Sequence, residues 1–371
     1  MIYLDNASTT KPQKAAREAV VETFENFGNP SSLHGLGLSS EKVITKAAES
    51  VAKALGVMPK NIYFTSGGTE SNNTAILGYC LANKKRGNHV ITTKIEHPSV
   101  LEPFHILEKN GFDVTYLDVN ENGEISLEQL EEVLREDTIF VSIMAVNNET
   151  GTIQPFDKAK AVMKKKSPKA VLHVDGVQGF LKVDIKPKAM GIDLLSLSGH
   201  KIGGIKGTGA LYIADNIHMN PLIAGGGQQK NMRSGTQNVP GIAALGAAVD
   251  SYVPVNKNIR EDLKNKIEEK IENVKINGTT NNSGYVLNVS FVGIKAEILL
   301  HTLEVKGIYV STGSACSSNK PMPSHVLTAM GCSKKEIEGA IRLSFSDEEF
   351  DVEYVADTLK EEVENIRKYV R

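Results

Sequence analysis

The stretch LLSLSGHKIGGIKGTGALYIA, residues 194–214, contains two apolar runs that are separated by a short glycine-rich loop. The runs LLSLS (194–198) and GALYIA (209–214) are typical of buried β-strands. The loop between them is shorter than the crossover of about a dozen residues that joins two parallel strands. The second strand is therefore predicted to run antiparallel to the first.

Strand-like runs alternate with helical patterns through the first two thirds of the chain. Five more strand candidates precede residue 194, at 61–66, 89–93, 113–119, 138–146 and 170–175. Helix-length segments, such as 126–136 and 156–166, separate most of them. This alternation predicts an α/β fold: a mostly parallel seven-stranded sheet with one antiparallel strand, covered by helices on both faces.

The pattern changes near residue 250. A charged helix is predicted at 256–274, and strand candidates follow at 284–292, 307–312 and 339–345. The last helix has apolar residues at a spacing of three and four, which indicates one buried face. These residues are Val352, Val355, Leu359, Val363, Ile366 and Val370. We therefore predict a large α/β domain over residues 14–250, and a smaller α+β domain formed by residues 251–371 together with the N-terminal segment 1–13.

The composition limits the classes of function that the chain can have. Its 371 residues include 42 basic and 44 acidic side chains, so no net charge attracts it to nucleic acid or to an anionic membrane surface. No apolar run approaches the ~20 residues of a membrane span, and the N-terminus lacks the layout of a signal peptide. Three cysteines without a spacing pattern, Cys80, Cys316 and Cys332, argue against a disulfide framework and for a reducing compartment. We expect a cytoplasmic protein.

Two glycines end the strand candidate 61–66 in FTSGGTESNN (64–73), and a helical pattern begins directly after them. Glycine allows a ligand to approach the backbone closely, and the first turn of a helix offers unpaired N–H groups to a phosphate. Gly68 and Thr69 are thus candidate phosphate-binding residues. A capped helix start after a tight turn explains this motif equally well on its own.

An aspartate, Asp175, ends the strand candidate 170–175 in AVLHVDGVQG (170–179). Open α/β folds bind ligands at the carboxyl ends of their strands, and a carboxylate there can hold a cationic ring nitrogen. Gln178, three residues later, can reach a phenolic oxygen. The alternative is an aspartate that serves only as a turn or cap residue.

Lys201 lies among glycines directly after the strand candidate 194–198, with Ser198 and His200 beside it. A lysine that is partly desolvated near other cations has a lowered pKa and can form a Schiff base. A solvated lysine at a strand end is the simpler alternative.

His97 follows the strand candidate 89–93 and precedes a proline. An imidazole at this place can stack on a flat aromatic cofactor or transfer protons. His89, His97 and His105 follow one another at intervals that do not match a helical ligand spacing, so no metal site is predicted.

Together these four features describe a site for an aromatic phosphate that carries a basic ring nitrogen and an aldehyde. Pyridoxal 5′-phosphate is the cofactor with this chemistry. The phosphate would lie at Gly68 and Thr69, the nitrogen at Asp175 and the aldehyde at Lys201.

In their order and wording the motifs resemble the cysteine desulfurases of the NifS/IscS type. These enzymes belong to the class V branch of the fold-type I pyridoxal-phosphate transferases. The resemblance extends from residue 1 to the end of the chain. It rests on the segments YLDNASTT (3–10), TSGGTESNN (65–73), EHPSV (96–100), VNNETG (146–151), HVDGVQ (173–178), SLSGHKI (196–202), MRSGTQN (232–238) and STGSACSS (311–318).

The resemblance implies a role for each matching residue around the cofactor ring. Lys201 would carry pyridoxal 5′-phosphate as a Schiff base and act as acid and base. His97 would stack on the ring. Asp175 would pair with the ring nitrogen and Gln178 would contact the 3′-oxygen.

The resemblance also assigns residues to the phosphate and to the substrate. Thr236, in MRSGTQN, matches a phosphate contact donated by a neighbouring subunit, which implies a homodimer. Asn148 and Arg342 match the residues that bind the substrate carboxylate, and Asn148 would also lie against the cofactor. A solvent-facing arginine is the simpler alternative for Arg342. The remaining phosphate contacts would come from Gly68, Thr69, Ser198 and His200.

Cys316 lies among small residues in GIYVSTGSACSSNKPMPSH (307–325). By the resemblance, its thiolate would take the sulfur of L-cysteine, which leaves L-alanine and a persulfide on Cys316. The persulfide would be passed to acceptor proteins such as an iron–sulfur scaffold, or to thio-cofactor synthesis or tRNA thiolation. Cys316 could also ligate an iron–sulfur cluster during that transfer, but the sequence does not determine the acceptor.

Other functions would use the same fold. A class V aminotransferase or a selenocysteine lyase would need the same cofactor pocket. A non-catalytic sulfur-transfer or scaffold protein would keep the fold without the cofactor. Lys201 argues against the scaffold, and Cys316 argues against the aminotransferase.

Overall fold

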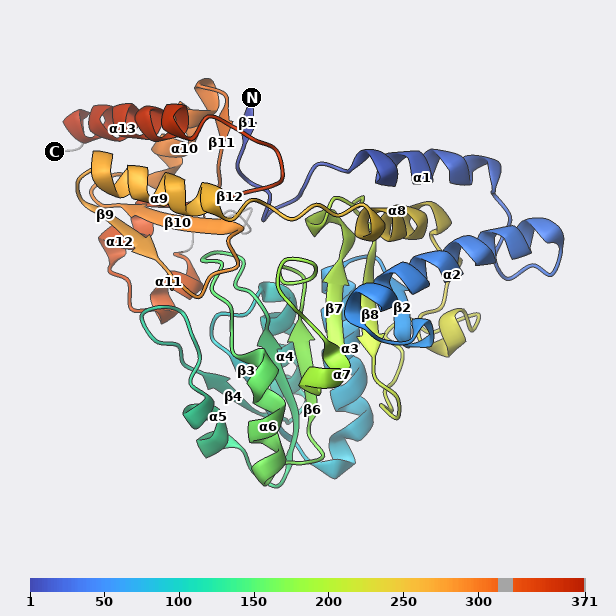
Figure 1. The fold of residues 1–371 in the computed structure, drawn as a ribbon. Helices are drawn as coiled ribbons and strands as arrows, with labels where there is room; N and C mark the ends of the chain where they lie inside the picture. Colours follow the sequence, from blue (N-terminus) through green and yellow to red (C-terminus); the bar gives the residue numbers. More distant parts are fainter. Residues whose placement is uncertain (313–322, 370–371) are drawn as a thin grey trace.

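A seven-stranded sheet forms the centre of the larger part of the molecule, and it has the strand order β2-β8-β7-β6-β5-β3-β4 (Figure 1). The structure is a computed structural model, which describes residues 1–312 and 323–369. The strands of this sheet are β2 (Ile62–Thr65), β3 (His89–Thr93), β4 (Asp113–Leu117), β5 (Thr138–Met144), β6 (Val171–Asp175), β7 (Leu194–Ser198) and β8 (Gly209–Ile213).

Strand β8 is the one antiparallel strand in this sheet. It pairs antiparallel with β7, from Leu194 opposite Ile213 to Ser198 opposite Gly209, and it pairs antiparallel with β2 on its other side. The pairs among β3, β4, β5, β6 and β7 are parallel. The prediction from the short loop after β7 is confirmed, because a loop of this length can only reverse the chain direction.

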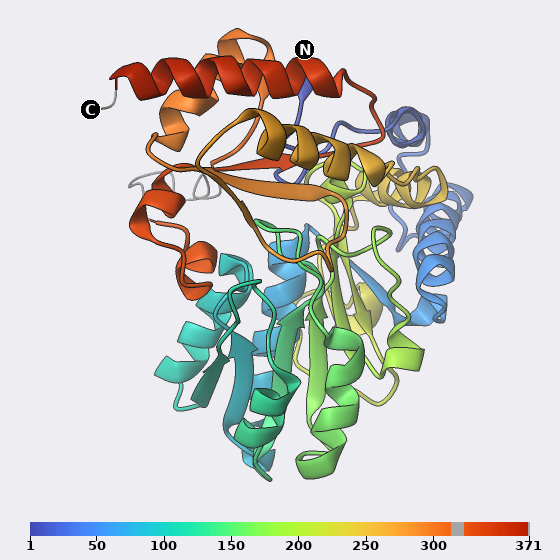
Figure 2. The ribbon, with the colours of Figure 1, turned by 60° about the vertical axis from the view of Figure 1, so that its left-hand side comes forward.

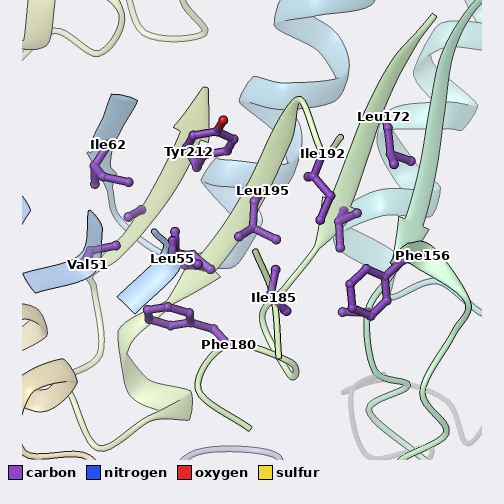
Figure 3. Packing of buried hydrophobic residues seen from close by; sticks show 14 of the residues in the cluster. Val51, Leu55, Ile62, Phe156, Leu172, Phe180, Ile185, Ile192, Leu195 and Tyr212 are labelled. Atoms are coloured by element: carbon purple, nitrogen blue, oxygen red, sulfur yellow. The ribbon is translucent and has the colours of Figure 1, made fainter. Parts of the chain in front are cut away.

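Helices cover both faces of the sheet. One face packs against α3 (Gly68–Asn83) and α4 (Pro98–Lys109), through buried residues such as Tyr79 and Phe104. The opposite face packs against α2 (Gly35–Leu55), α5 (Leu127–Val133), α6 (Phe156–Lys166) and α8 (Val239–Asp250). Figure 3 shows part of the packing on this opposite face, where Val51 and Leu55 of α2 lie near Ile62 and Tyr212 of the sheet.

The remaining short elements connect this framework. Helix α1 (Lys14–Glu25) packs against α8 at the rim of the molecule (Figure 1). The other short helices are α7 (Pro187–Met190), η1 (Pro59–Asn61), η2 (Lys84–Arg86), η3 (Gly199–Lys201) and η4 (Gln229–Asn231).

A second and smaller core lies around a three-stranded antiparallel sheet of order β12-β10-β9. Figure 2 shows this sheet. Its strands are β9 (Val274–Asn277), β10 (Val286–Phe291) and β12 (Ala340–Ser344), and a separate parallel pair joins β1 (Ile2–Tyr3) to β11 (Ile308–Tyr309). The helices of this region are α9 (Asn258–Lys270), α10 (Ala296–Val305), α11 (His325–Ala329), α12 (Lys334–Glu338) and α13 (Val352–Tyr369).

The predicted buried face of the last helix is found in α13. Val355, Leu359, Val363 and Ile366 are all buried in the second core, Val352 is partly buried against it, and Val370 lies outside the described residues. The N-terminal residues Leu4 and Ala7 pack into the same core. The core around β10 is separate from the cores on the two faces of the large sheet, which supports the division at residue 250 that we propose, with residues 1–13 on the side of the smaller domain.

Among the described residues no helix is both long and apolar enough to span a membrane.

Candidate active site

Lys201 lies where the N-terminal segment crosses the carboxyl end of β7. Its Nζ donates hydrogen bonds to the carbonyl oxygens of Ala7 (2.6 Å) and Ser8 (2.7 Å). The crossing segment is held along the lysine loop by backbone hydrogen bonds from Thr10 N to His200 O and from Gln13 N to Gly203 O. Residues nearly 200 positions apart in the chain are thereby brought together at the lysine amine.

Asp175 ends β6 and is 5% exposed. Its carboxylate accepts hydrogen bonds from Asn72 Nδ2 (2.8 Å) and from the Val177 backbone N–H (2.9 Å). Burial raises the pKa of this carboxyl, while these hydrogen bonds and the nearby His97 and Lys201 act in the opposite direction. A buried carboxylate of this kind favours a cationic partner, such as a protonated ring nitrogen.

His97 caps the N-terminus of α4, and its ring is oriented by Ser99. The Ser99 backbone N–H donates to His97 Nδ1 (3.1 Å), so Nδ1 is an acceptor and the neutral ring carries its proton on Nε2. Ser99 Oγ lies 2.8 Å from Nδ1 and accepts from Asn72 Nδ2 (2.9 Å). Burial lowers the pKa of His97, which keeps the imidazole neutral.

A polar cradle lies between the N-terminus of α3 and the end of β7. Ser198 is 3% exposed, and its Oγ is buried without a hydrogen-bond partner among the described residues. A side chain at Gly68 would place its Cβ 2.6 Å from Val177 Cγ2, so glycine is required for this close approach. Thr69, beside it, is exposed. An unpartnered hydroxyl beside free helix N–H groups fits an anion.

His200 and Gln178 complete the side of the site next to the N-terminal segment. His200 Nδ1 lies 3.2 Å from Thr9 Oγ1, and burial together with the charge of Lys201 lowers the pKa of His200 to about 4. Gln178 Nε2 donates to Ala7 O (2.8 Å), the same carbonyl that accepts from Lys201.

Arg342, on β12, reaches from the smaller core toward the N-terminal segment. Its guanidinium forms an ion pair with Asp5 (2.9 Å) and donates to Ser8 Oγ (2.6 Å) and to Asn148 O (3.0 Å). The residue is 5% exposed, so the solvent-facing alternative is wrong. Its Nε is buried and has no partner among the described residues, which leaves a donor for a carboxylate.

Two predicted site residues are not placed beside Lys201. Cys316 lies outside the described residues. Thr236 is exposed on the loop between β8 and α8, and no hydrogen bond of the described part of the chain connects it to Ser198 or His200. Arg233, in the same loop, forms an ion pair with Glu70 (2.9 Å) at the start of α3.

Sequence reasoning missed several residues of this site. Asn72 and Ser99 link Asp175 to His97, and Asp5 holds Arg342. Asn72 follows Gly68 by four residues on a helix, so the two residues lie on the same helix face, and this spacing could have indicated Asn72 as a site residue. The contact between Asp5 and Arg342 had no such local signal.

Glu96, next to His97, is a further buried carboxyl. Its Oε1 accepts from Met144 N (2.8 Å) and Thr93 Oγ1 (3.0 Å), whereas Oε2 has no partner among the described residues. Burial, with a smaller contribution from the Asp175 charge, raises the pKa of Glu96 to about 8. Glu96 is therefore protonated at neutral pH.

Glu96→Gln is expected to flatten the pH dependence of stability. Between about pH 4.5 and 8 the folded protein keeps a proton on Glu96 that the unfolded chain loses, so wild-type stability falls as pH rises. Glutamine mimics the protonated carboxyl. Relative to wild type, the variant should gain roughly 2–4 kcal/mol in unfolding free energy from pH 5 to pH 8, measured by urea unfolding. The exposed Glu102→Gln is the control, and parallel curves for Glu96→Gln and wild type would contradict the assignment.

Comparison with known proteins identifies the family of the chain. Residues 2–354 match the family described as aminotransferase class-V. The chain belongs to the class V aminotransferase family. It is 42% identical to cysteine desulfurase IscS of Clostridium botulinum over 380 residues, which cover 99% of this chain and 95% of that protein.

Two solved structures have the same fold as this chain. A NifS-like protein superposes with a TM-score of 0.89 at 36% identity, covering 99% of this chain and 98% of the other. The structure of SspA in complex with cysteine gives a TM-score of 0.86 at 37% identity, covering 94% of this chain and 100% of the other.

This class V family depends on pyridoxal phosphate, and the residues present fit that group. The partnerless Ser198 Oγ beside the N-terminus of α3 suits a phosphate, the buried carboxylate of Asp175 suits a ring nitrogen, and the Lys201 amine suits an aldehyde. The chemistry of these donors agrees with the cofactor in each part of the site.

Proposed function

We propose that this chain is a cysteine desulfurase, which removes the sulfur atom of L-cysteine and releases L-alanine. The observation that carries the proposal is the meeting of Lys201 and Gln178 at the Ala7 carbonyl, with Arg342 held at the adjoining Ser8. The Lys201 amine and the Arg342 guanidinium, which could bind a carboxylate, therefore contact the same short segment. The similarity to a desulfurase over nearly the whole chain supports the same activity.

The cofactor would be held by the residues that the motifs predicted. Lys201 would bind its aldehyde, Asp175 its ring nitrogen and Gln178 its phenolic oxygen, while His97 would cover the ring. When bound, pyridoxal phosphate supplies an electron sink for the bonding electrons at the substrate Cα. The phosphate would be held by Gly68, Thr69, Ser198 and His200.

Lys201 and His97 are the groups that would move protons. Lys201 Nζ, once displaced by the substrate amine, would act as the base at Cα and as the acid that protonates the product. His97 carries its ring proton on Nε2, because Nδ1 accepts from the Ser99 backbone N–H. Asn72 connects Asp175 to Ser99, the residue that orients His97, because its amide donates to Asp175 and to Ser99 Oγ.

Cys316 would receive the sulfur. The C–S bond of L-cysteine breaks, a bond forms between Cys316 Sγ and the departing sulfur, and the thiol proton balances the new methyl group of alanine. One thiol and one cysteine thus give one persulfide and one alanine, with no external oxidant. A second thiol or an acceptor protein then takes the outer sulfur.

Arg342 would bind the substrate carboxylate, together with Asn148. Arg342→Lys is expected to raise KM for L-cysteine about 10- to 100-fold while kcat changes less than about threefold, because lysine cannot replace the forked donors. Steady-state kinetics measures both constants. A fall in kcat at unchanged KM would instead assign Arg342 to the chemical step.

A second copy of the chain would complete the site. Thr236 is exposed, and we infer that it reaches the phosphate of a partner subunit in a homodimer. Exposed apolar side chains on α1 and on the segment between α1 and α2 support such an interface: Val21, Phe24, Phe27 and Leu33 are 63%, 64%, 77% and 93% exposed. Residues of this kind are rarely left in water over a continuous region.

The persulfide would serve iron–sulfur cluster assembly or a related thiolation pathway in the cytoplasm. The name of the Clostridium botulinum relative, IscS, supports an iron–sulfur scaffold as acceptor. Cys80 and Cys332 are free thiols, which is consistent with a reducing compartment.

The products formed from L-cysteine test the proposal. A desulfurase yields alanine and, under a thiol reductant, sulfide in equal amounts without a keto acid. An aminotransferase yields a keto acid product only when an amino acceptor is supplied. Formation of the keto acid, without sulfide, would overturn the proposed function in favour of the aminotransferase.

A further inference from the structure

A cavity of about 820 Å³ opens beside Lys201, between the N-terminal segment and the two cores. Gln178 and Lys201 line it, and so does a second lysine, Lys182, to which the proposed function gives no role. Lys182 follows Gln178 by four residues in the segment after β6.

Lys182 is hydrogen-bonded to Gln178, the side chain that would contact the cofactor. Its Nζ donates to Gln178 Oε1 (3.1 Å), while Gln178 Nε2 donates to Ala7 O (2.8 Å). A carbonyl is only an acceptor, so the amide must turn its NH₂ toward Ala7, and the Lys182 amine then donates to the oxygen on the other side. Rotating the amide by 180° would place its oxygen against the Ala7 carbonyl and would lose both hydrogen bonds.

The correctly oriented amide retains a donor. Gln178 Nε2 has two N–H groups, and the Ala7 carbonyl takes one of them. No hydrogen bond among the described residues uses the second, so it can serve an acceptor in the cavity that Gln178 lines. A phenolate oxygen is such an acceptor, and an amide with the opposite orientation would present its own oxygen to it.

The smaller core holds Lys182 in place. Its Nζ lies 5.4 Å from the centroid of the Tyr285 ring, within the range of a cation–π contact. The Tyr285 hydroxyl in turn accepts hydrogen bonds from Tyr252 Oη (2.9 Å) and from the Val255 backbone N–H (3.2 Å). Lys182 is thus fixed between a side chain of the sheet region and a ring next to β10.

We propose that Lys182 is a positioning residue for the cofactor, which acts through Gln178 by fixing the orientation of its side-chain amide. This inference rests on the proposed function, because it assumes that Gln178 contacts the phenolic oxygen of pyridoxal phosphate. It adds a residue outside the group that the motifs assigned, and it connects the cofactor to Tyr285 in the other core.

The pKa of Lys182 reflects its buried position between other cations. Burial, followed by the charges of Lys201 and Arg342, lowers the pKa of Lys182 to about 7.

The affinity of the cofactor-free full-length protein for pyridoxal phosphate tests the proposal. Lys182→Met is expected to weaken binding about tenfold, the effect of losing one buried hydrogen bond. Lys182→Arg, which keeps the charge and the donors, should bind within about threefold of wild type. Lys206→Met is the matched control, since Lys206 lines the same cavity without a hydrogen bond to Gln178. It should bind as wild type does.

A double-mutant cycle separates positioning from a general charge effect. If Lys182 acts through Gln178, the double variant Lys182→Met/Gln178→Ala should bind no more than about twofold more weakly than Gln178→Ala alone. Losses that multiply, or wild-type affinity in Lys182→Met, would overturn the proposal. If Lys182→Met does not fold, Lys182→Gln, which lacks the charge and is one bond shorter, takes its place with the same expectation.

The failure of the inference and that of the proposed function give different results. A wild-type protein that binds no pyridoxal phosphate would overturn both. A wild-type protein that binds it normally, with Lys182→Met equal to wild type, would overturn only the role of Lys182.

Discussion

Lys201→Ala is expected to lower the rate of alanine formation from L-cysteine at least about a thousandfold. The lysine amine has two tasks, since it would bind the cofactor aldehyde and then transfer the Cα proton. In the structure it is held at the Ala7 and Ser8 carbonyls, next to the Gln178 amide. Removing the amine leaves the pocket intact but takes away both the covalent link and the base. The rate is measured as alanine released per active site.

Lys206→Ala provides the control for this experiment. Lys206 lies in the same loop and is exposed, and it should be replaced with little effect on the rate. The absorption of the bound cofactor gives a second readout, because Lys201→Ala should lose the band that depends on the covalent link. Full alanine formation by Lys201→Ala would exclude Lys201 from the chemistry.

Cys316→Ala is expected to reduce sulfide release from L-cysteine at least about 100-fold and to leave the cofactor absorption unchanged. The reason is that the thiolate of Cys316 would accept the substrate sulfur, whereas it would not hold the cofactor. A separation between lost turnover and an intact cofactor spectrum is specific to a sulfur-accepting thiol. Selenocysteine, whose selenium needs no thiol nucleophile, should still be converted to alanine by this variant.

Cys332→Ala is the matched control for the thiol. Cys332 lies just before α12 and is half-buried, and its Sγ is 3.8 Å from Lys275 Nζ. Its replacement should retain sulfide release. If Cys316→Ala kept full desulfurase turnover instead, the sulfur would leave by a route that does not involve this cysteine.

The sheet and one part of the site could be predicted from local sequence. The short loop 199–208 determined the direction of β8, and the runs of β-branched and apolar residues located all seven strands of the large sheet within a few residues. Asp175, Ser198 and Lys201 were found for the same reason. Asp175 and Ser198 end recognisable strands and Lys201 follows one, and the carboxyl ends of neighbouring parallel strands lie at one edge of a sheet.

The rest of the site depends on contacts between distant segments. The Ala7 carbonyl accepts from Lys201, which lies 194 residues away, and Asp5 pairs with Arg342 across 337 residues. No local pattern encodes such a contact, because every residue type has a backbone carbonyl and the two partners of an ion pair can be separated by any number of residues. Lys182 was missed for a related reason: its role depends on Tyr285 and on the orientation of one amide.

The absorption spectrum of the purified protein, before and after addition of L-cysteine, tests the central claim most directly. We expect a band near the visible edge that shifts when cysteine is added, with alanine and sulfide appearing together under a thiol reductant. A protein that stays colourless after incubation with pyridoxal phosphate would contradict the roles of Lys201 and Asp175. It would favour a scaffold that keeps the fold without the chemistry.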